Sequence, residues 1–182
     1  MLRLNGCPQC KKHVYVPWSK RKYCPRCGTA RFDTDGKPKE LVYYFPVRSK
    51  LKALLKTPGY KRMVQHEFFR PRNEEVMSDV YDAPAWKDFM GAVVYPNNRI
   101  GLLFCIDGIP AFAANTLSLK PAELVNLSLP PAVRSKIENI LLMMLLPSSM
   151  KGEDAKKYYD FASTYELQDL YTNGTCWSQL LR

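Results

Sequence analysis

The chain has no long apolar segment. Its strongest apolar run, Ile140 to Leu146, holds only seven residues before Pro147, whereas a membrane-spanning helix needs about 20. Residues 1–6 lead directly into Cys7 without the apolar stretch of a secretory signal peptide. We therefore expect a protein that is neither embedded in a membrane nor secreted. We interpret the apolar run itself as part of a core helix.

Acidic residues are scarce in the first 72 positions. This part has 18 Lys and Arg against 4 Asp and Glu, a net charge of +14, whereas residues 73–182 have 9 against 13, a net charge of −4. Such asymmetry indicates a partner that carries phosphate, foremost a nucleic acid. The alternative is a lysine-rich face that only keeps the protein soluble.

Four of the six cysteines form two Cys-x-x-Cys pairs. The pairs are Cys7-Pro-Gln-Cys10 and Cys24-Pro-Arg-Cys27, and the thirteen residues between them suffice for one short hairpin. Four thiolates thereby reach one tetrahedral Zn²⁺. A disulfide framework or scattered buried thiols is the alternative, but neither requires Pro inside both pairs or Gly28 after the second. We expect a zinc ribbon over residues 1–34, with structural zinc held by Cys7, Cys10, Cys24 and Cys27.

The first histidine and the other cysteines have no predicted part in this site. Four thiolates already close a structural zinc site, so we interpret His13 as a surface residue of the hairpin. Four cysteines at metal spacing also indicate a reducing compartment. Cys105 and Cys176 are then unpaired thiols, and we assign them no role.

Basic side chains are concentrated around the second cysteine pair. We expect DNA phosphate contacts from five of them: Lys20, Arg21, Lys22, Arg26 and Arg31. Such contacts give affinity that falls with salt and depends little on sequence, because base edges and not charges specify a site. Tyr15, Trp18 and Tyr23 lie near these residues. They are either exposed for base contacts or packed in the small core of the ribbon.

The segment after the ribbon, residues 35–79, is predicted to be a basic connector. It holds a strand or extended arm at residues 41–45 and helices at residues 48–56 and 60–68. Residues 70–79 have no apolar period and are predicted to form a loop.

Residues 80–182 are predicted to form an α/β core. We expect a short helix opened by Pro84, a buried central strand within residues 97–108 and a helix at residues 133–146 that covers this strand. Asp107 ends the strand and has two interpretations, a residue of an Asp-Gly turn or the first metal ligand of a phosphoryl-transfer site. The later acids are interpreted as solvated: Asp154, Asp160, Glu166 and Asp169.

Several segments taken in order resemble transposases of the CACTA (En/Spm) family. The similarity covers residues 20–160 and is carried by Cys24-Pro-Arg-Cys27-Gly28 with Arg31, Tyr44-Phe45-Pro46, Leu51, Asp82-Ala-Pro-Ala-Trp86-Lys87, Arg99 to Phe112, and Asn126 to Asn139. The chain departs from the family pattern in having Ile109 after Asp-Gly and Ser128 in the Asn-Leu-Pro-Pro segment.

The resemblance implies a DDE-type transposase with an RNase H-like fold behind the ribbon, in which Asp107 is a catalytic carboxylate. Two Mg²⁺ ions at such a site need several carboxylates, and the resemblance places the others beyond Arg182. It also implies DNA such as transposon ends as a partner, an oligomer or other transposase subunits, and a nuclear location. The chain is thus predicted to be a transposase fragment that binds DNA without catalysing alone. The alternatives are a non-catalytic zinc-ribbon adaptor for nucleic acid or protein, and an inert transposon remnant.

Overall fold

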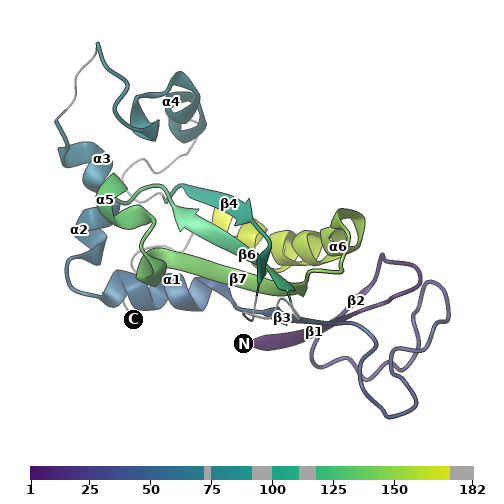
Figure 1. The fold of residues 1–182 in the computed structure, drawn as a ribbon. Coiled ribbons are helices and arrows are strands. Elements are labelled where there is room, and N and C mark those ends of the chain that lie inside the picture. Colours follow the sequence, from purple (N-terminus) through teal and green to yellow (C-terminus); the bar gives the residue numbers. More distant parts are fainter. Residues whose placement is uncertain (72–74, 92–99, 111–117, 173–182) are drawn as a thin grey trace. The chain divides into compact units, whose positions relative to one another are not determined.

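The protein contains both helices and strands, as the sequence predicts (Figure 1). The structure is a computed structural model that describes residues 1–71, 75–91, 100–110 and 118–172. The sequence predictions for residues 72–74, 97–99 and 111–112 and for Cys176 concern residues that lie outside the described ranges. No helix in the described part of the chain is long and apolar enough to cross a membrane.

The chain divides into two compact units, each assembled from three separate stretches. Unit 1 comprises Met1–Arg48, Ile106–Glu123 and Leu142–Gly174, and unit 2 comprises Ser49–Cys105, Leu124–Leu141 and Thr175–Arg182. The boundaries after residues 34 and 79 that the sequence suggested stay a prediction.

The described strands belong to one sheet, with the order β2-β1-β3-β7-β6-β4 and with β5 paired to β6. Their bounds are β1 Leu2–Gly6, β2 Val14–Tyr15, β3 Leu41–Tyr44, β4 Leu102–Ile106, β5 Ile109–Pro110, β6 Ser118–Asn126 and β7 Ile140–Pro147. The pairs β1–β2, β1–β3, β3–β7 and β5–β6 are antiparallel. A mixed α/β class is therefore confirmed, and the RNase H-like arrangement stays a prediction.

Strand β1 joins the cysteine segment to the sheet of unit 1. It pairs with β2 on one side, where Asn5 lies opposite Tyr15, and with β3 on the other, where Leu4 lies opposite Val42. Leu4 and Val42 are fully buried. The ribbon is thus a continuation of the sheet and not a separate appendage.

Helix α6, Gly152–Ala162, packs in unit 1 with one side buried. Ala155, Tyr158 and Ala162 are its buried apolar residues. Near its end, the Phe161 ring meets the buried Tyr44 ring edge to face, with 5.8 Å between ring centroids. The helix continues into a π-helical turn, Ser163–Leu167, and then into α7, Gln168–Thr172.

Glu166, in the π-helical turn, is buried and not solvated as predicted. Its carboxylate accepts hydrogen bonds from the backbone N–H groups of Val47 (2.9 Å) and Arg48 (2.7 Å) and from the Tyr44 hydroxyl. Val47 begins α1, Val47–Lys56, so Glu166 caps the positive end of this helix. The prediction failed because these partners lie more than a hundred residues away in the chain.

In unit 2, the connector helices pack around a small apolar core. The helix predicted at residues 48–56 is confirmed as α1, and the one predicted at residues 60–68 is split into α2, Tyr60–Val64, and α3, His66–Phe69. Buried residues of this core are Leu55, Tyr60, Val64 and Leu129.

A second cluster of unit 2 is built around Tyr81 and Trp86. Tyr81 lies in the turn η1, Val80–Asp82, and Trp86 in α4, Pro84–Gly91, the helix predicted from Pro84. The two rings meet at 5.3 Å in a T-shaped contact. Gly101 allows Trp86 its position, because a Cβ there would lie 2.3 Å from the indole ring.

Residues 140–147 form strand β7, so the helix predicted at residues 133–146 is wrong. Helix α5 is limited to Pro131–Arg134. The apolar run has no polar residue that would reveal a period, and its Leu and Met residues favour helices when taken alone. In the sheet it lies between β3 and β6, where a strand covered on both faces is apolar throughout.

Strand β4 forms where a strand was predicted, but it is not the buried central strand expected. It stands last in the order of the described strands. Leu103, Phe104 and Ile106 are exposed by 48%, 40% and 43%. An apolar sequence run is therefore no guide to burial at this position.

Candidate metal centre and basic groove

The four cysteines predicted to bind zinc lie together in unit 1. Their sulfur atoms are all within 4.8 Å of one another, with 3.5 Å between Cys7 and Cys27 and 3.6 Å between Cys10 and Cys24. A tetrahedron with Zn–S bonds of about 2.3 Å has sulfur separations of about 3.8 Å, whereas a disulfide bond is about 2.05 Å long. The cluster therefore fits a metal ion and not a pair of disulfides.

Each Cys-x-x-Cys pair ends in a backbone turn, and the two turns have the same conformation. The residues that follow the pairs, Lys11 and Gly28, have left-handed φ angles of 55° and 72°. The Lys11 N–H donates to the Cys7 carbonyl (3.3 Å), and the Gly28 N–H donates to that of Cys24 (2.9 Å). Glycine adopts this conformation without strain, which explains Gly28 in the second turn.

Hydrogen bonds favour the thiolate form of one cysteine in the cluster, Cys27. The hydroxyl and backbone N–H of Thr29 lower the pKa of Cys27 to about 6. Burial raises the pKa of the Cys7 thiol to about 12. A bound cation would offset the cost of a buried Cys7 thiolate. The donor set therefore suits a positively charged metal.

Lys157 of α6 contacts the first cysteine turn. Its ammonium, with a side chain 4% exposed, donates to the Cys7 carbonyl oxygen (3.2 Å) and pairs with Glu40 (2.6 Å). Tyr158 donates its hydroxyl to the same Glu40 carboxylate. Gly6 permits this approach, because a Cβ at Gly6 would lie 2.7 Å from Lys157 Cε.

Arg31, one of the five predicted DNA contacts, is buried within the ribbon. Its guanidinium donates to the Asn5 side chain (2.9 Å) and the Ser19 carbonyl (2.8 Å), and it lies over the rings of Tyr15 and Phe32. Arg31 is therefore a structural residue and not a phosphate contact as predicted. The other four predicted contacts are exposed: Lys20, Arg21, Lys22 and Arg26.

The aromatic residues of the ribbon divide between core and surface. Tyr15 is buried, whereas Trp18 and Tyr23 are each 64% exposed. His13 is half-buried with its ring edge to face against Tyr15, at 4.6 Å between centroids. Of the two interpretations left open, packing holds for Tyr15, and exposure holds for Trp18 and Tyr23.

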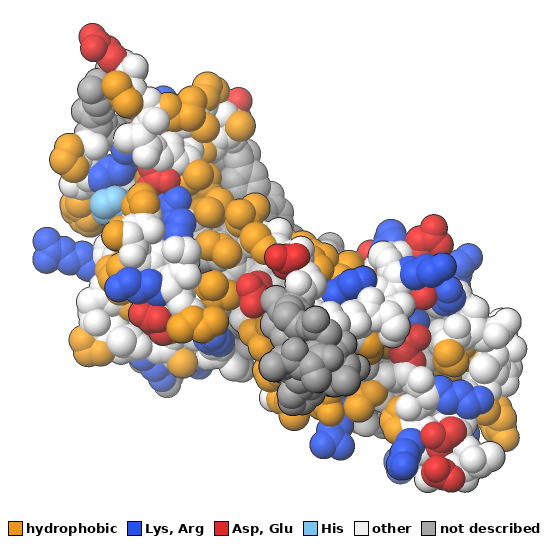
Figure 2. Space-filling model, viewed as in Figure 1, with side chains coloured by type: hydrophobic (Ala, Val, Ile, Leu, Met, Phe, Trp, Pro, Cys, Tyr) orange, Lys and Arg blue, Asp and Glu red, His pale blue; other side chains and the backbone are white. Residues whose placement is uncertain are grey.

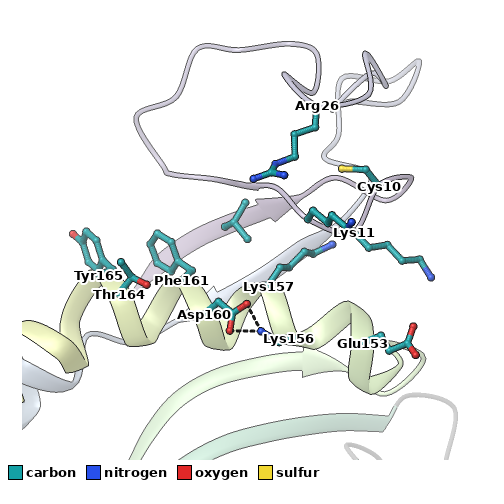
Figure 3. Close-up of a pocket in the computed structure, with 12 residues that line it drawn as sticks. Cys10, Lys11, Arg26, Glu153, Lys156, Lys157, Asp160, Phe161, Thr164 and Tyr165 are labelled. Carbon is teal, nitrogen blue, oxygen red and sulfur yellow. Dashed lines mark hydrogen bonds and ion pairs between the residues drawn. The ribbon is translucent and has the colours of Figure 1, made fainter.

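A groove of about 1090 Å³ runs between the ribbon and α6 within unit 1 (Figure 3). Cys10 lines it, so the cysteine cluster adjoins one wall. Five cations and two acids also line it: Lys11, Lys12, Arg26, Lys156, Lys157, Glu153 and Asp160. Of these cations the sequence prediction named only Arg26. Lys156 and Lys157 were missed because they come from the part of the chain with negative net charge.

Acids partly balance the cations around the groove. Lys11 pairs with Asp154 at 2.9 Å, which raises the pKa of Lys11, and Lys156 pairs with Asp160 at 2.6 Å. In the space-filling view, acidic side chains are interspersed among the basic ones (Figure 2). Among the described residues, Lys12 and Arg26 have no ion-pair partner, so they are the groove cations best able to meet an external anion.

Asp107 is exposed in the turn after β4. Its side-chain oxygen accepts a hydrogen bond from the Gly108 N–H at 2.7 Å, which is the arrangement expected of an Asp-Gly turn. Across the described ranges of the chain, the four cysteines are the group placed to hold a metal, and Asp107 has no such group around it. A catalytic role for Asp107 stays a prediction.

The fold and site together define a mixed α/β protein with a cluster of four cysteines that could bind a metal, beside a basic groove. Comparison of the chain with family models, curated proteins and solved structures finds no match. The resemblance to CACTA transposases accordingly stays a prediction based on the sequence segments given above.

Proposed function

We propose that the protein binds DNA through unit 1, with a structural zinc ion at the four cysteines. One observation carries the proposal. Arg26 lies between the ligand residues Cys24 and Cys27, is exposed, and points into the groove (Figure 3). Metal binding to the flanking cysteines fixes the backbone of Arg26 and thereby the place of its charge.

Zinc is the metal we propose because four thiolates in a tetrahedron are a common structural zinc site. Zinc with four thiolates carries a net charge of −2, which the surrounding basic residues exceed. The phosphate-binding surface therefore persists when the metal is bound.

Phosphate contacts by Lys12 and Arg26 in the groove, with Lys20, Arg21 and Lys22 on the ribbon, supply the affinity. Each neutralised phosphate of a duplex contributes about −0.9 to the slope of log affinity against log salt. Contacts of this kind position a protein on DNA but do not read its sequence.

From the resemblance we propose that this module is part of a DDE-type transposase with an RNase H-like core and a nuclear location. In that context Asp107 would hold Mg²⁺ only together with carboxylates of a complete core. The activity we propose for this chain is DNA docking and not strand transfer.

The test measures duplex binding by fluorescence anisotropy for a Lys12→Ala, Arg26→Ala double variant of the zinc-loaded chain. The control is Lys37→Ala with Lys39→Ala, which removes two exposed cations of unit 1 that do not line the groove. At about 50 and 200 mM salt, the groove variant should bind more weakly and lose about 1.8 from the salt slope. Equal losses in both variants, or none in either, would contradict the proposal.

A further inference from the structure

The groove of unit 1 has an aromatic end. Phe161 and Tyr165 stack with 5.0 Å between ring centroids and 13° between ring planes. Trp18, from the ribbon, lies 6.4 Å from Tyr165 with 41° between the planes. Trp18 is 64% and Tyr165 45% exposed. Two aromatic faces from distant parts of the sequence thus meet at the solvent.

Tyr165 packs against the buried side chain of Tyr44. The buried Tyr44 ring stands edge to face against Tyr165 at 6.4 Å, and Tyr44 donates its hydroxyl to Glu166. Tyr165 itself belongs to the π-helical turn, a feature that is rare in helices and frequent at functional sites. The ring is therefore a preformed platform and not a freely rotating surface side chain.

The cations lie toward the other end of the same groove. Figure 3 shows Tyr165 and Phe161 at one end of the groove and Lys11 toward the other, with Arg26 and Lys157 on opposite sides of the space between. A ligand that spans the groove thus meets flat apolar surfaces at one end and positive charge at the other. A chain of unpaired nucleotides has both complementary features in its bases and phosphates.

We infer that this groove binds an unpaired stretch of nucleic acid, with a base on the Tyr165 platform and phosphates at Lys12 and Arg26. The inference rests on the proposed function and specifies its ligand. In a duplex the faces of the bases are covered by their neighbours, so an aromatic platform gains nothing from paired DNA. The volume of about 1090 Å³ has room for a few nucleotides, since pockets for single small ligands span about 300–1000 Å³.

The test compares the zinc-loaded full chain with Tyr165→Leu and Tyr165→Phe variants. The probe is a labelled thymidine oligonucleotide of about ten residues, within the length that single-strand sites cover. Loss of a stacked base should weaken binding roughly 5- to 150-fold in Tyr165→Leu, while Tyr165→Phe keeps the ring and the affinity. Affinity for a duplex should change less than about twofold in both variants, because duplex contacts come from the phosphates.

Tyr23→Leu is the control for Tyr165→Leu, because Tyr23 is an exposed tyrosine of unit 1 that does not line the groove. A second readout is the quenching of tryptophan fluorescence by the oligonucleotide, which should be lost in Trp18→Phe. This readout uses a variant that leaves Tyr165 untouched, so it holds even if Tyr165→Leu fails to fold.

The outcomes separate this inference from the proposed function. Duplex and oligonucleotide binding that are unaffected by Tyr165→Leu, with no quenching at Trp18, would overturn the inference and leave DNA binding standing. No binding to either nucleic acid would overturn both. Competition by thymidine monophosphate as strong as by the oligonucleotide would assign the site to free nucleotides. Equal competition by an aspartate peptide would show that charge alone is recognised. Strong competition by the mononucleotide or by the peptide would each overturn the inference.

Discussion

The ammonium of Lys157 lies 3.2 Å from the backbone carbonyl oxygen of Cys7, a residue of the four-cysteine cluster 150 positions earlier in the chain. The same ammonium pairs with Glu40 in a place that is largely closed to water. This contact ties α6 to the first cysteine turn. We therefore expect metal binding at the cysteines and the packing of α6 to be coupled within unit 1.

Replacing Lys157 by Met should destabilise the protein by about 2–4 kcal/mol, because it leaves the Glu40 carboxylate without its cation in a poorly hydrated place. Urea unfolding of the zinc-loaded protein measures the change. The matched control is Lys156→Met, which removes the neighbouring, exposed lysine and should cost less than about 0.5 kcal/mol. Adding Glu40→Gln to Lys157→Met should recover part of the loss. Equal effects at Lys156 and Lys157 would refute this account.

Replacing Cys24 by Ser should abolish stoichiometric metal binding, since three thiolates no longer close the tetrahedron. Cys105→Ser is the control, because Cys105 is a free thiol on β4 away from the cluster. Metal content by mass spectrometry under native conditions should be one zinc per chain in the parent and in Cys105→Ser. One zinc retained by Cys24→Ser would exclude the four-cysteine site.

Replacing Glu166 by Ala should cost about 2–4 kcal/mol of stability. The change leaves the buried Tyr44 hydroxyl and the N–H groups that begin α1 without their hydrogen-bond acceptor. Each buried donor without an acceptor costs about 1–3 kcal/mol. Asp169→Ala, which removes the exposed ion pair with Arg48, should change stability by less than about 1 kcal/mol. Thermal and urea unfolding monitor both variants. A Glu166 variant as stable as the Asp169 variant would argue against the cap.

The stability of unit 2 should fall in acid because of Asp82. A hydrogen bond from Arg70 holds the pKa of Asp82 well below its ordinary value. Burial opposes this effect to a smaller extent, and the backbone N–H groups of Ser78 and Asp79 lower the pKa further. A carboxylate with a lowered folded-state pKa stabilises fully above its unfolded pKa of about 3.9 and loses this contribution as the pH falls below it. Asp82→Asn should therefore flatten the loss of stability between about pH 5 and pH 2.5. An unchanged acid slope would contradict this assignment.

Local patterns were sufficient to predict some of the fold. The Cys-x-x-Cys spacing predicted the sulfur cluster, and the charge and apolar period of residues 48–56 predicted α1. In both cases the residues that determine the structure are close to one another in the sequence. The prediction failed at residues 140–147, where an unbroken apolar run is compatible with either a helix or a strand. Only the neighbours β3 and β6 decide for the strand.

The groove could not be predicted from local sequence. Arg26 was predicted as one of the basic residues around the second cysteine pair, but Lys156 and Tyr165 come from a segment whose net charge is negative. Arg31 shows the opposite failure, because its charge suggested a surface role while Asn5 and Ser19 hold it inside the ribbon. Which basic residue faces solvent depends on partners that are distant in the chain.

The central claim is that zinc holds the DNA-binding surface of unit 1 in place. The most direct measurement titrates labelled duplex DNA with the full chain at two salt concentrations, with and without chelator, and follows zinc content in the same samples. The account predicts binding that requires zinc and weakens steeply with salt. A fully zinc-loaded protein that does not bind DNA would contradict it and would favour a ribbon that binds a protein partner or an inert remnant.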